Sequence, residues 1–254
     1  MYGYDRLRAD LGEALADADS ALAAANRLCE VCVELLEVDG ASISLVQAGA
    51  SHGTFGASGD LSRQLDEYQF TFGEGPCIDA VRHGGPVLAP DLSDPAEQRW
   101  PAFRGAVLDL GVSAVFALPV AIASASVGAL DLYRNRSGSL SPDTLTGGLL
   151  AAELSALPLL DLMTSDVDWE SAGQGEGAWE QLASLERVEV YQATGMIMGA
   201  MDVGPAEALV RLRAKAFMRG LTASELAWAI VERRLSLAGD EWRRDLGDSS
   251  EATR

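Results

Sequence analysis

Three cysteines and two histidines are the side chains of this 254-residue chain that could carry covalent, redox or metal chemistry. Cys29 and Cys32 have the spacing of a redox pair. Cys77 follows a Gly-Pro step at the expected start of a helix, where a thiol pKa can be lowered. His52 and His83 lack metal-ligand spacing to any cysteine or carboxylate cluster. The sequence therefore predicts no metal site and no catalytic residue, and a redox-sensing role for Cys77 stays open at this level.

The first element that positions these thiols is an expected helix over residues 5–38. This stretch has no proline, and its small and apolar residues follow a heptad repeat: Leu11, Ala18, Ala25 and Cys32 at one position, and Leu15, Leu22, Cys29 and Leu36 at the other. The pattern predicts one long amphipathic helix whose seam suits a partner helix, and hence a homodimer in at least one signalling state. On such a seam a cysteine behaves as a small hydrophobe.

A set of strand patterns follows this helix. Residues 41–46 alternate, 115–122 form a mostly apolar run, and 127–133 resume a strand pattern. The segments between them include FGEGPCIDAV (72–81), PVLAPDL (86–92) and RWPAF (99–103). Together with the later strands, these segments resemble the GAF domain family over most of residues 25–163. The resemblance implies a central antiparallel sheet flanked by helices, with a pocket for a small ligand on one face.

The GAF resemblance implies sensing of a small molecule without turnover. The family accommodates cyclic nucleotides, haem, bilins and other molecules, and nothing in this sequence indicates which of them binds, so the cofactor is unknown. The candidate pocket residues are Phe55, Phe72, Cys77, Phe116 and Tyr133.

A second set of spaced residues lies near the C-terminus. The stretch RVEVYQATGMIM (187–198) precedes Ala208-x-x-x-Leu212-Arg213-x-x-Ala216-Phe217, and Leu221-Thr222-x-x-Glu225-Leu226-Ala227 follows. These motifs resemble the ANTAR domain over roughly residues 179–237. The resemblance implies a three-helix module that binds paired RNA hairpins and prevents transcription termination. Where that family often has Ala-Lys-Gly, this chain has Ala-Thr-Gly at 193–195, so one basic phosphate contact is missing.

Local signals predict the ends and faces of the three helices. Pro205 suits a first helical turn, Gly220 a helix end, and Thr222-x-x-Glu225 a capping box. A stripe of Ala208, Leu212 and Ala216 should face the core. Four cations should lie on the other faces of that helix and meet solvent or phosphate: Arg211, Arg213, Lys215 and Arg219. The predicted RNA-binding residues are Arg187, Tyr191, Ala193, Thr194, Gly195, Arg211 and Arg213.

Charge limits how this module could bind RNA. The whole chain carries a formal charge of −19, which argues against non-specific nucleic-acid binding. Residues 186–238 contain seven basic and six acidic side chains, a net charge of about +1. Recognition by this segment should therefore depend on loop shape and base contacts.

The predicted fold class is α+β, a GAF-like antiparallel sheet flanked by helices and followed by a small three-helix ANTAR module. The expected boundaries are 1–24 for an N-terminal helix, 20–163 for the GAF-like domain, 164–177 for a linker, 178–238 for the ANTAR module and 239–254 for an acidic tail. The sequence shows no signal peptide and no membrane span, and three cysteines suit a reducing compartment, so we expect a cytoplasmic protein.

Two functions from different classes are compatible with these patterns. The first is a regulator in which a GAF sensor controls an RNA-binding antitermination module, with no enzymatic activity. The alternative is a redox enzyme similar to the free methionine sulfoxide reductases, with the C-terminal helices serving oligomerisation. The enzyme requires a nucleophilic thiol and a resolving thiol close together in space.

Overall fold

The structure is a computed structural model that describes residues 4–16, 18–47, 50–123, 125–164, 187–237 and 242. The chain divides into two compact units, Met1–Leu185 and Glu186–Arg254. The predicted linker falls almost wholly outside the described residues, as does the predicted acidic tail apart from Trp242. Within the described part, no helix is both long enough and apolar enough to cross a membrane.

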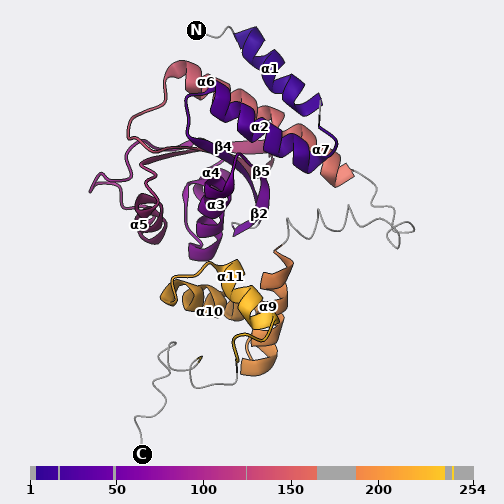
Figure 1. The fold of residues 1–254 in the computed structure, drawn as a ribbon, viewed down its shortest axis with the longest axis vertical. Helices are drawn as coiled ribbons and strands as arrows, with labels where there is room; N and C mark the ends of the chain where they lie inside the picture. The colour runs from indigo at the N-terminus through magenta and orange to yellow at the C-terminus, as the bar shows by residue number, and fades with distance from the viewer. Residues whose placement is uncertain are drawn as a thin grey trace, which may run out of the picture. The chain divides into compact units, whose positions relative to one another are not determined.

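The first unit is built on a five-stranded antiparallel sheet in the order β2-β1-β5-β4-β3 (Figure 1). The strands are β1 (Gly40–Gln47), β2 (Ala50–Ala57), β3 (Val87–Ala89), β4 (Ala114–Ile122) and β5 (Ala125–Arg134). β5 lies at the centre, with Leu130 opposite both Ile43 of β1 and Leu118 of β4. The predicted antiparallel sheet is confirmed.

Helices cover both faces of this sheet (Figure 1). One face carries α1 (Tyr4–Ala16), α2 (Ala21–Leu35), α6 (Pro142–Leu154) and α7 (Ala156–Thr164), and the other carries α3 (Asp60–Phe72), α4 (Pro76–His83) and α5 (Pro101–Asp109). Because side chains alternate along a strand, the sheet separates two apolar clusters. Leu130 and Leu132 of β5 belong to the cluster under α2 and α6, whereas Ala129 and Tyr133 belong to the cluster under α3 and α4.

The single long helix expected over residues 5–38 is wrong. α1 ends at Ala16, and α2 begins at Ala21 with Ser20 as its N-cap. The Ser20 hydroxyl accepts a hydrogen bond from the backbone N–H of Ala23 at 3.1 Å, which satisfies a donor that a new helix start leaves free. Seven residues of the expected seam pack in the core of their own unit: Leu11, Ala25, Cys29, Cys32 and Leu36 are fully or nearly fully buried, and Leu15 and Leu22 are partly buried. The seam therefore packs within the unit and is not free for a partner helix.

The second unit contains three described helices, α9 (Val188–Met201), α10 (Pro205–Met218) and α11 (Ala223–Val231). Pro205 occupies the first turn of α10, and the Thr222–Glu225 capping box opens α11, both as predicted. Gly220 has a φ of 64°, and the N–H of Leu221 donates to the carbonyl of Ala216 at 3.0 Å, which closes α10 in a Schellman motif.

Apolar side chains from all three described helices pack in the core of this unit. Ala208, Leu212 and Ala216 of α10 are fully buried, which confirms the predicted stripe. They pack with α9 and α11, whose buried residues include Ile197 and Leu226. The helix ends and the α10 core stripe thus follow the sequence signals.

Candidate functional site

A buried polar network lies between the sheet and α3. Asp66 of α3 accepts a hydrogen bond from the Ser44 hydroxyl of β1 on one carboxylate oxygen and from the Thr54 hydroxyl of β2 on the other, each at 2.5 Å. Asp66 and Ser44 are fully buried. Because buried carboxylates need such donors, these two bonds anchor α3 across the two strands.

Gln69, one turn further along α3, links the central strand to the start of α4. Its amide N–H donates to Asp131 Oδ2 of β5 at 2.5 Å, and its amide oxygen accepts from the backbone N–H of Cys77 at 2.8 Å. Gly75 makes room for this side chain: a Cβ at that position would lie 2.4 Å from Gln69 Oε1, and its φ of 151° favours glycine. The side chain of Gln69 therefore joins the carboxyl group of Asp131 on β5 to the first turn of α4.

Asp131 is the unusual member of this network. Only 4% of it is exposed, and its Oδ1 has no hydrogen-bond partner among the described residues. Burial raises the pKa of Asp131 to about 8, the charge of Asp66 adds to the increase, and the bond from Gln69 opposes it. Near neutral pH this side chain is largely a neutral carboxyl. A buried polar atom without a partner in an otherwise bonded network marks a position for a bound molecule or an ordered water.

The five predicted ligand-binding residues do not meet in one place. Cys77 and Tyr133 are buried in the cluster under α3 and α4, and Phe72 packs against it. Phe55 and Phe116 are buried in the cluster on the opposite face of the sheet. Side chains alternate between the two faces along a strand, so Phe116 of β4 shares the face of Leu118 and Val120 and not that of Cys77.

Sequence reasoning missed the polar residues that form the network. These are Ser44, Thr54, Asp66, Gln69 and Asp131. One signal was available: Asp131 interrupts the apolar run of β5 between two leucines. A charged residue at an inward position of a central strand indicates either a binding role or a structural network.

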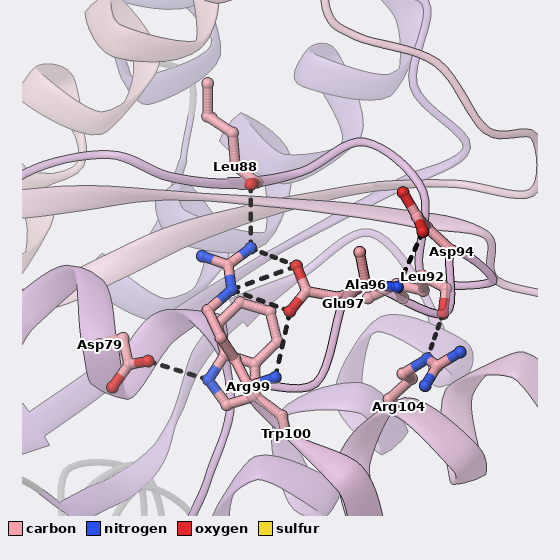
Figure 2. A network of polar contacts seen from close by, with 9 residues as sticks. All are labelled: Asp79, Leu88, Leu92, Asp94, Ala96, Glu97, Arg99, Trp100 and Arg104. Carbon is pink, nitrogen blue, oxygen red and sulfur yellow. Dashed lines mark hydrogen bonds and ion pairs between the residues drawn. The ribbon is translucent and has the colours of Figure 1, made fainter.

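The loop between β3 and α5 is fixed by a second polar network at the edge of this face (Figure 2). The Arg99 guanidinium pairs with Glu97 at 2.5 Å, donates to the carbonyl of Leu88 at 3.2 Å and stacks 4.3 Å over the Trp100 ring. The Trp100 indole N–H donates to Asp79 of α4 at 2.9 Å. The hydrogen bond to Arg99 lowers the pKa of Glu97. The RWPAF segment thus ties its loop to α4.

The three cysteines lie on two different faces of the sheet. Cys29 and Cys32 are fully buried among the residues of α2 that face the sheet. Burial raises the pKa of Cys32 to about 12 and raises that of Cys29 well above its usual value. Cys77 is buried in the other cluster. A thiol reacts as the thiolate, so Cys29 and Cys32 are chemically quiet in this fold. Across the described ranges, no group of three histidine, cysteine or acidic side chains could hold a metal ion.

The predicted RNA-binding residues of α9 divide between its inner and outer sides. Tyr191 is 54% exposed, and Gly195, one turn on, is exposed with no atom within 4 Å of where a Cβ would lie. Ala193 is fully buried, and Thr194 and Arg187 are 9% and 6% exposed. A lysine at the Thr194 position would therefore start from a buried site, and the Ala-Thr-Gly departure places a small polar residue in the core of the unit.

The cations of α10 also divide. Arg211 is half-buried and pairs with Glu207 at 2.6 Å, and Arg213 is half-buried as well. Lys215 is fully buried, so the expectation that it faces solvent or phosphate is wrong. The outer face of α9 includes three exposed residues that the sequence patterns did not single out: Gln192, Met196 and Gly199.

The first unit is an α+β domain with a central antiparallel sheet, helices on both faces and a polar network between the sheet and α3. The model of the GAF domain matches residues 19–156, more than half of the chain. The chain therefore belongs to the GAF domain family and contains a GAF sensor domain.

Several solved structures are similar to this chain. The GAF domain of a phosphoenolpyruvate-protein phosphotransferase from Coxiella burnetii is 16% identical, with a TM-score of 0.51 over 62% of this chain and 93% of that one. A domain of a two-component sensor histidine kinase protein from Sinorhizobium meliloti is 17% identical, with a TM-score of 0.45 over 59% and 95%. A type II free methionine-R-sulfoxide reductase from Thermoplasma acidophilum is 16% identical, with a TM-score of 0.44 over 56% and 92%. No curated protein matches the chain.

Proposed function

We propose that this protein is a regulator in which the GAF domain senses a small molecule and controls RNA binding by the C-terminal three-helix unit, an ANTAR module that prevents transcription termination. The observation that carries the proposal is the outer face of α9, where exposed Tyr191 lies one turn from exposed Gly195. The helix starts at Pro205 and Thr222, where the ANTAR-like motifs place them, support the same reading.

The outer face of α9 has the chemistry to hold an unstacked RNA base. Tyr191 offers an exposed ring on which a base can stack. Gly195 and Gly199 leave the backbone accessible on the same side, and neither has an atom within 4 Å of a Cβ position. Each interior helical glycine costs about 1 kcal/mol relative to alanine, and no packing among the described residues of the unit compensates for that cost. Close approach of a partner to this face would compensate for that cost.

Charge supports recognition of bases over recognition of phosphates alone. Residues 187–237 contain seven basic and five acidic side chains, and two of the arginines, Arg211 and Arg234, pair with acids on their own helix or turn. Few cations are left to neutralise phosphates, so binding should fall only moderately with salt. This fits hairpin loops, whose bases are presented without a partner strand.

The ligand of the GAF domain would bind at the Asp131 network. Oδ1 of Asp131, which has no partner among the described residues, can donate to a ligand when the carboxyl is protonated and can accept when it is ionised. The two titratable members of the network, Asp66 and Asp131, are both acidic. The ligand should therefore be neutral or cationic and rich in hydrogen-bonding groups.

We further propose that the regulator acts as a cytoplasmic homodimer. With the α1–α2 seam buried, the described helices offer a different apolar surface: Leu149 of α6 and Leu157 and Leu160 of α7 are each more than 40% exposed. Replacing Leu157 with glutamate should shift the protein to a monomeric mass in light scattering. An unchanged dimer would exclude this surface, and a monomeric wild type would exclude the homodimer.

The positions and the pKa values of the thiols do not support the redox-enzyme alternative. It requires two thiols close together, with one of them reactive. The Cys29–Cys32 pair is buried with raised pKa values, and Cys77 lies on the other face of the sheet.

The test of the proposed function is a gel-shift titration of the full chain with paired-hairpin RNA, using a single-stranded RNA of the same composition as competitor. Tyr191→Ala should weaken hairpin binding roughly tenfold, the loss expected for one stacked base. Val210→Ala is the matched control, because Val210 is 63% exposed on α10 and outside the proposed face. Equal binding by wild type and the Tyr191 variant, or no preference for hairpins, would refute the proposal.

A further inference from the structure

Asp131 carries the proposed ligand site of the GAF domain, yet it is closed off from solvent. Only 4% of the residue is exposed. Of the helices on this face of the sheet, α3 packs mainly on β1 and β2, whereas α4 packs on β4 and on β5, the strand that bears Asp131. A molecule that bonds to Asp131 must therefore displace part of this cover.

The two helices are attached to the sheet in different ways. Asp66 fixes α3 directly, because its carboxylate accepts from hydroxyls of both β1 and β2 at 2.5 Å. For α4, the backbone N–H of Cys77 donates to Gln69 of α3 at 2.8 Å, and Asp79 accepts from the Trp100 indole at 2.9 Å. Neither of these bonds joins α4 to a strand. The polar contacts described here thus allow α4 to leave the sheet while α3 stays in place.

Glycines flank α4 at both ends. The helix has eight residues, Pro76–His83, and it lies between Gly75, with a φ of 151°, and Gly84, with a φ of 65°. Gly85 follows, and a Cβ added there would meet no atom within 4 Å. Hinges are a few loop or helix-end residues that absorb backbone rotation, and glycine rotates with the least steric hindrance. Both ends of α4 therefore suit a hinge.

The charge of Asp131 sets the cost of keeping α4 in place. With α4 on the sheet, Oδ2 has the Gln69 donor at 2.5 Å, and Oδ1 has no partner among the described residues. A neutral carboxyl tolerates this position, whereas a buried carboxylate with one donor is costly. Loss of the proton therefore favours any movement that admits water to Oδ1.

No described side chain around Asp131 offsets a negative charge there. The residues opposite it on β1 and β4 are Ser42 and Ala117. The titratable residues packed on the same side are Asp66 of α3, Cys77 of α4 and Tyr133 of β5. The other titratable residues of α4 are engaged or exposed: Asp79 pairs with Arg82 at 2.8 Å, and His83 is exposed. Burial and the charge of Asp66 accordingly raise the pKa of Asp131 to about 8.

We propose that α4 is a lid over Asp131, that Gln69 latches it, and that it opens when Asp131 loses its proton. With the lid closed, the protonated carboxyl is sealed under α4. With the lid open, Oδ1 meets water or a ligand. This inference rests on the proposed ligand site, and it adds the route of entry and the group that controls it.

The experiment measures backbone hydrogen exchange of the full chain by mass spectrometry from pH 6 to pH 9, without RNA or ligand. Each rate is divided by that of the urea-unfolded chain at the same pH, which gives a protection factor. Peptides of α4 report the lid, and peptides of α6, on the other face of the sheet, are the control. Protection of α4 should fall roughly tenfold per pH unit up to about pH 8 and then level off, because opening releases one proton.

Two variants test the control by Asp131. Asp131→Asn, which stays neutral, should remove this fall in protection. Asp66→Asn should move the levelling-off to lower pH, because the charge of Asp66 raises the pKa of Asp131. Circular dichroism checks the fold of both, and Asp66→Asn provides the comparison if Asp131→Asn does not fold.

Low concentrations of urea distinguish the lid from global unfolding. Local opening exposes little surface, so exchange of α4 should hardly respond to urea, whereas exchange of α6 should respond steeply. Equal protection and equal urea dependence of α4 and α6 would overturn the lid. The same pH profile in wild type and Asp131→Asn would overturn its control by Asp131. Absence of hairpin binding in the gel shift would refute the RNA function and leave these exchange results unaffected.

Discussion

Replacing Gly195 with alanine should stabilise the protein, whereas a bulky residue at the same position should weaken its binding to RNA. Gly195 lies in the interior of α9, and a Cβ added there would meet no atom within 4 Å. Alanine should therefore gain about 1 kcal/mol in the free energy of unfolding, because it restricts the unfolded chain and favours the helix. For a unit of this size the gain corresponds to a rise of about 4–8 °C in the melting temperature.

The size of the residue at position 195 separates stability from binding. Gly195→Leu retains the better helix propensity but places a bulky side chain on the outer face of α9, so hairpin affinity should fall roughly tenfold or more, about the loss of one stacked base. Scanning calorimetry and gel shifts on the full chain measure the two quantities.

Gly12→Ala is the matched control for this experiment. Gly12 lies within α1 of the other unit, and it too has no atom within 4 Å of a Cβ position. Its replacement should stabilise the first unit and leave RNA affinity unchanged. If Gly195→Ala destabilises the protein, the outer side of α9 is packed and the reasoning fails. If Gly195→Leu binds RNA like the wild type, this face is not the RNA interface.

Three further predictions concern the first unit. Burial raises the pKa of Asp131 from its usual 3.8 to about 8, so the folded state keeps a proton that the unfolded state releases as pH rises. Relative to Asp131→Asn, the wild type should lose a few kcal/mol in the free energy of unfolding between about pH 4 and pH 8, and the loss should then level off. If urea denaturation gives a constant difference in this free energy between the two proteins across that range, Asp131 is not protonated through burial. Ser20→Ala should cost about 1 kcal/mol of stability through loss of the α2 cap, measured by the same method, and no loss would mean that the cap is dispensable. Cys29, Cys32 and Cys77 should react with a thiol reagent only on unfolding, because all three are buried, and rapid reaction of any of them in the native protein would revive a redox role.

Sequence patterns predicted the three central strands of the sheet because each of them carries its own signal. Ile43 belongs to an alternating stretch and Leu118 and Leu130 to mostly apolar ones, and the three residues pair in the central three strands. The ends of α10 and α11 were equally local, since Pro205 and the Thr222–Glu225 box act within one turn. Such features depend on neighbours in sequence, and sequence alone can find them.

Features that depend on distant partners were not predictable in this way. Residues 5–38 do follow a heptad repeat, but a second helix begins after the N-cap Ser20. The two helices that result pack on the core of their own unit. Asp131 and Gln69 are 62 residues apart, and only the packing of α3 on the sheet joins them. Lys215 lies on a helix whose other cations are at least partly exposed, yet it is fully buried, and the Trp242 ring lies 5.4 Å from its ammonium from beyond the last helix.

The covered lysine also bears on the lifetime of the protein. Cells mark proteins for destruction by linking tags to lysine amines, and among its side chains this chain offers a single acceptor. That acceptor lies under an indole ring. A tagging enzyme would therefore reach this acceptor only when the packing around it opens, so the lifetime of the protein would depend on local unfolding of the C-terminal unit.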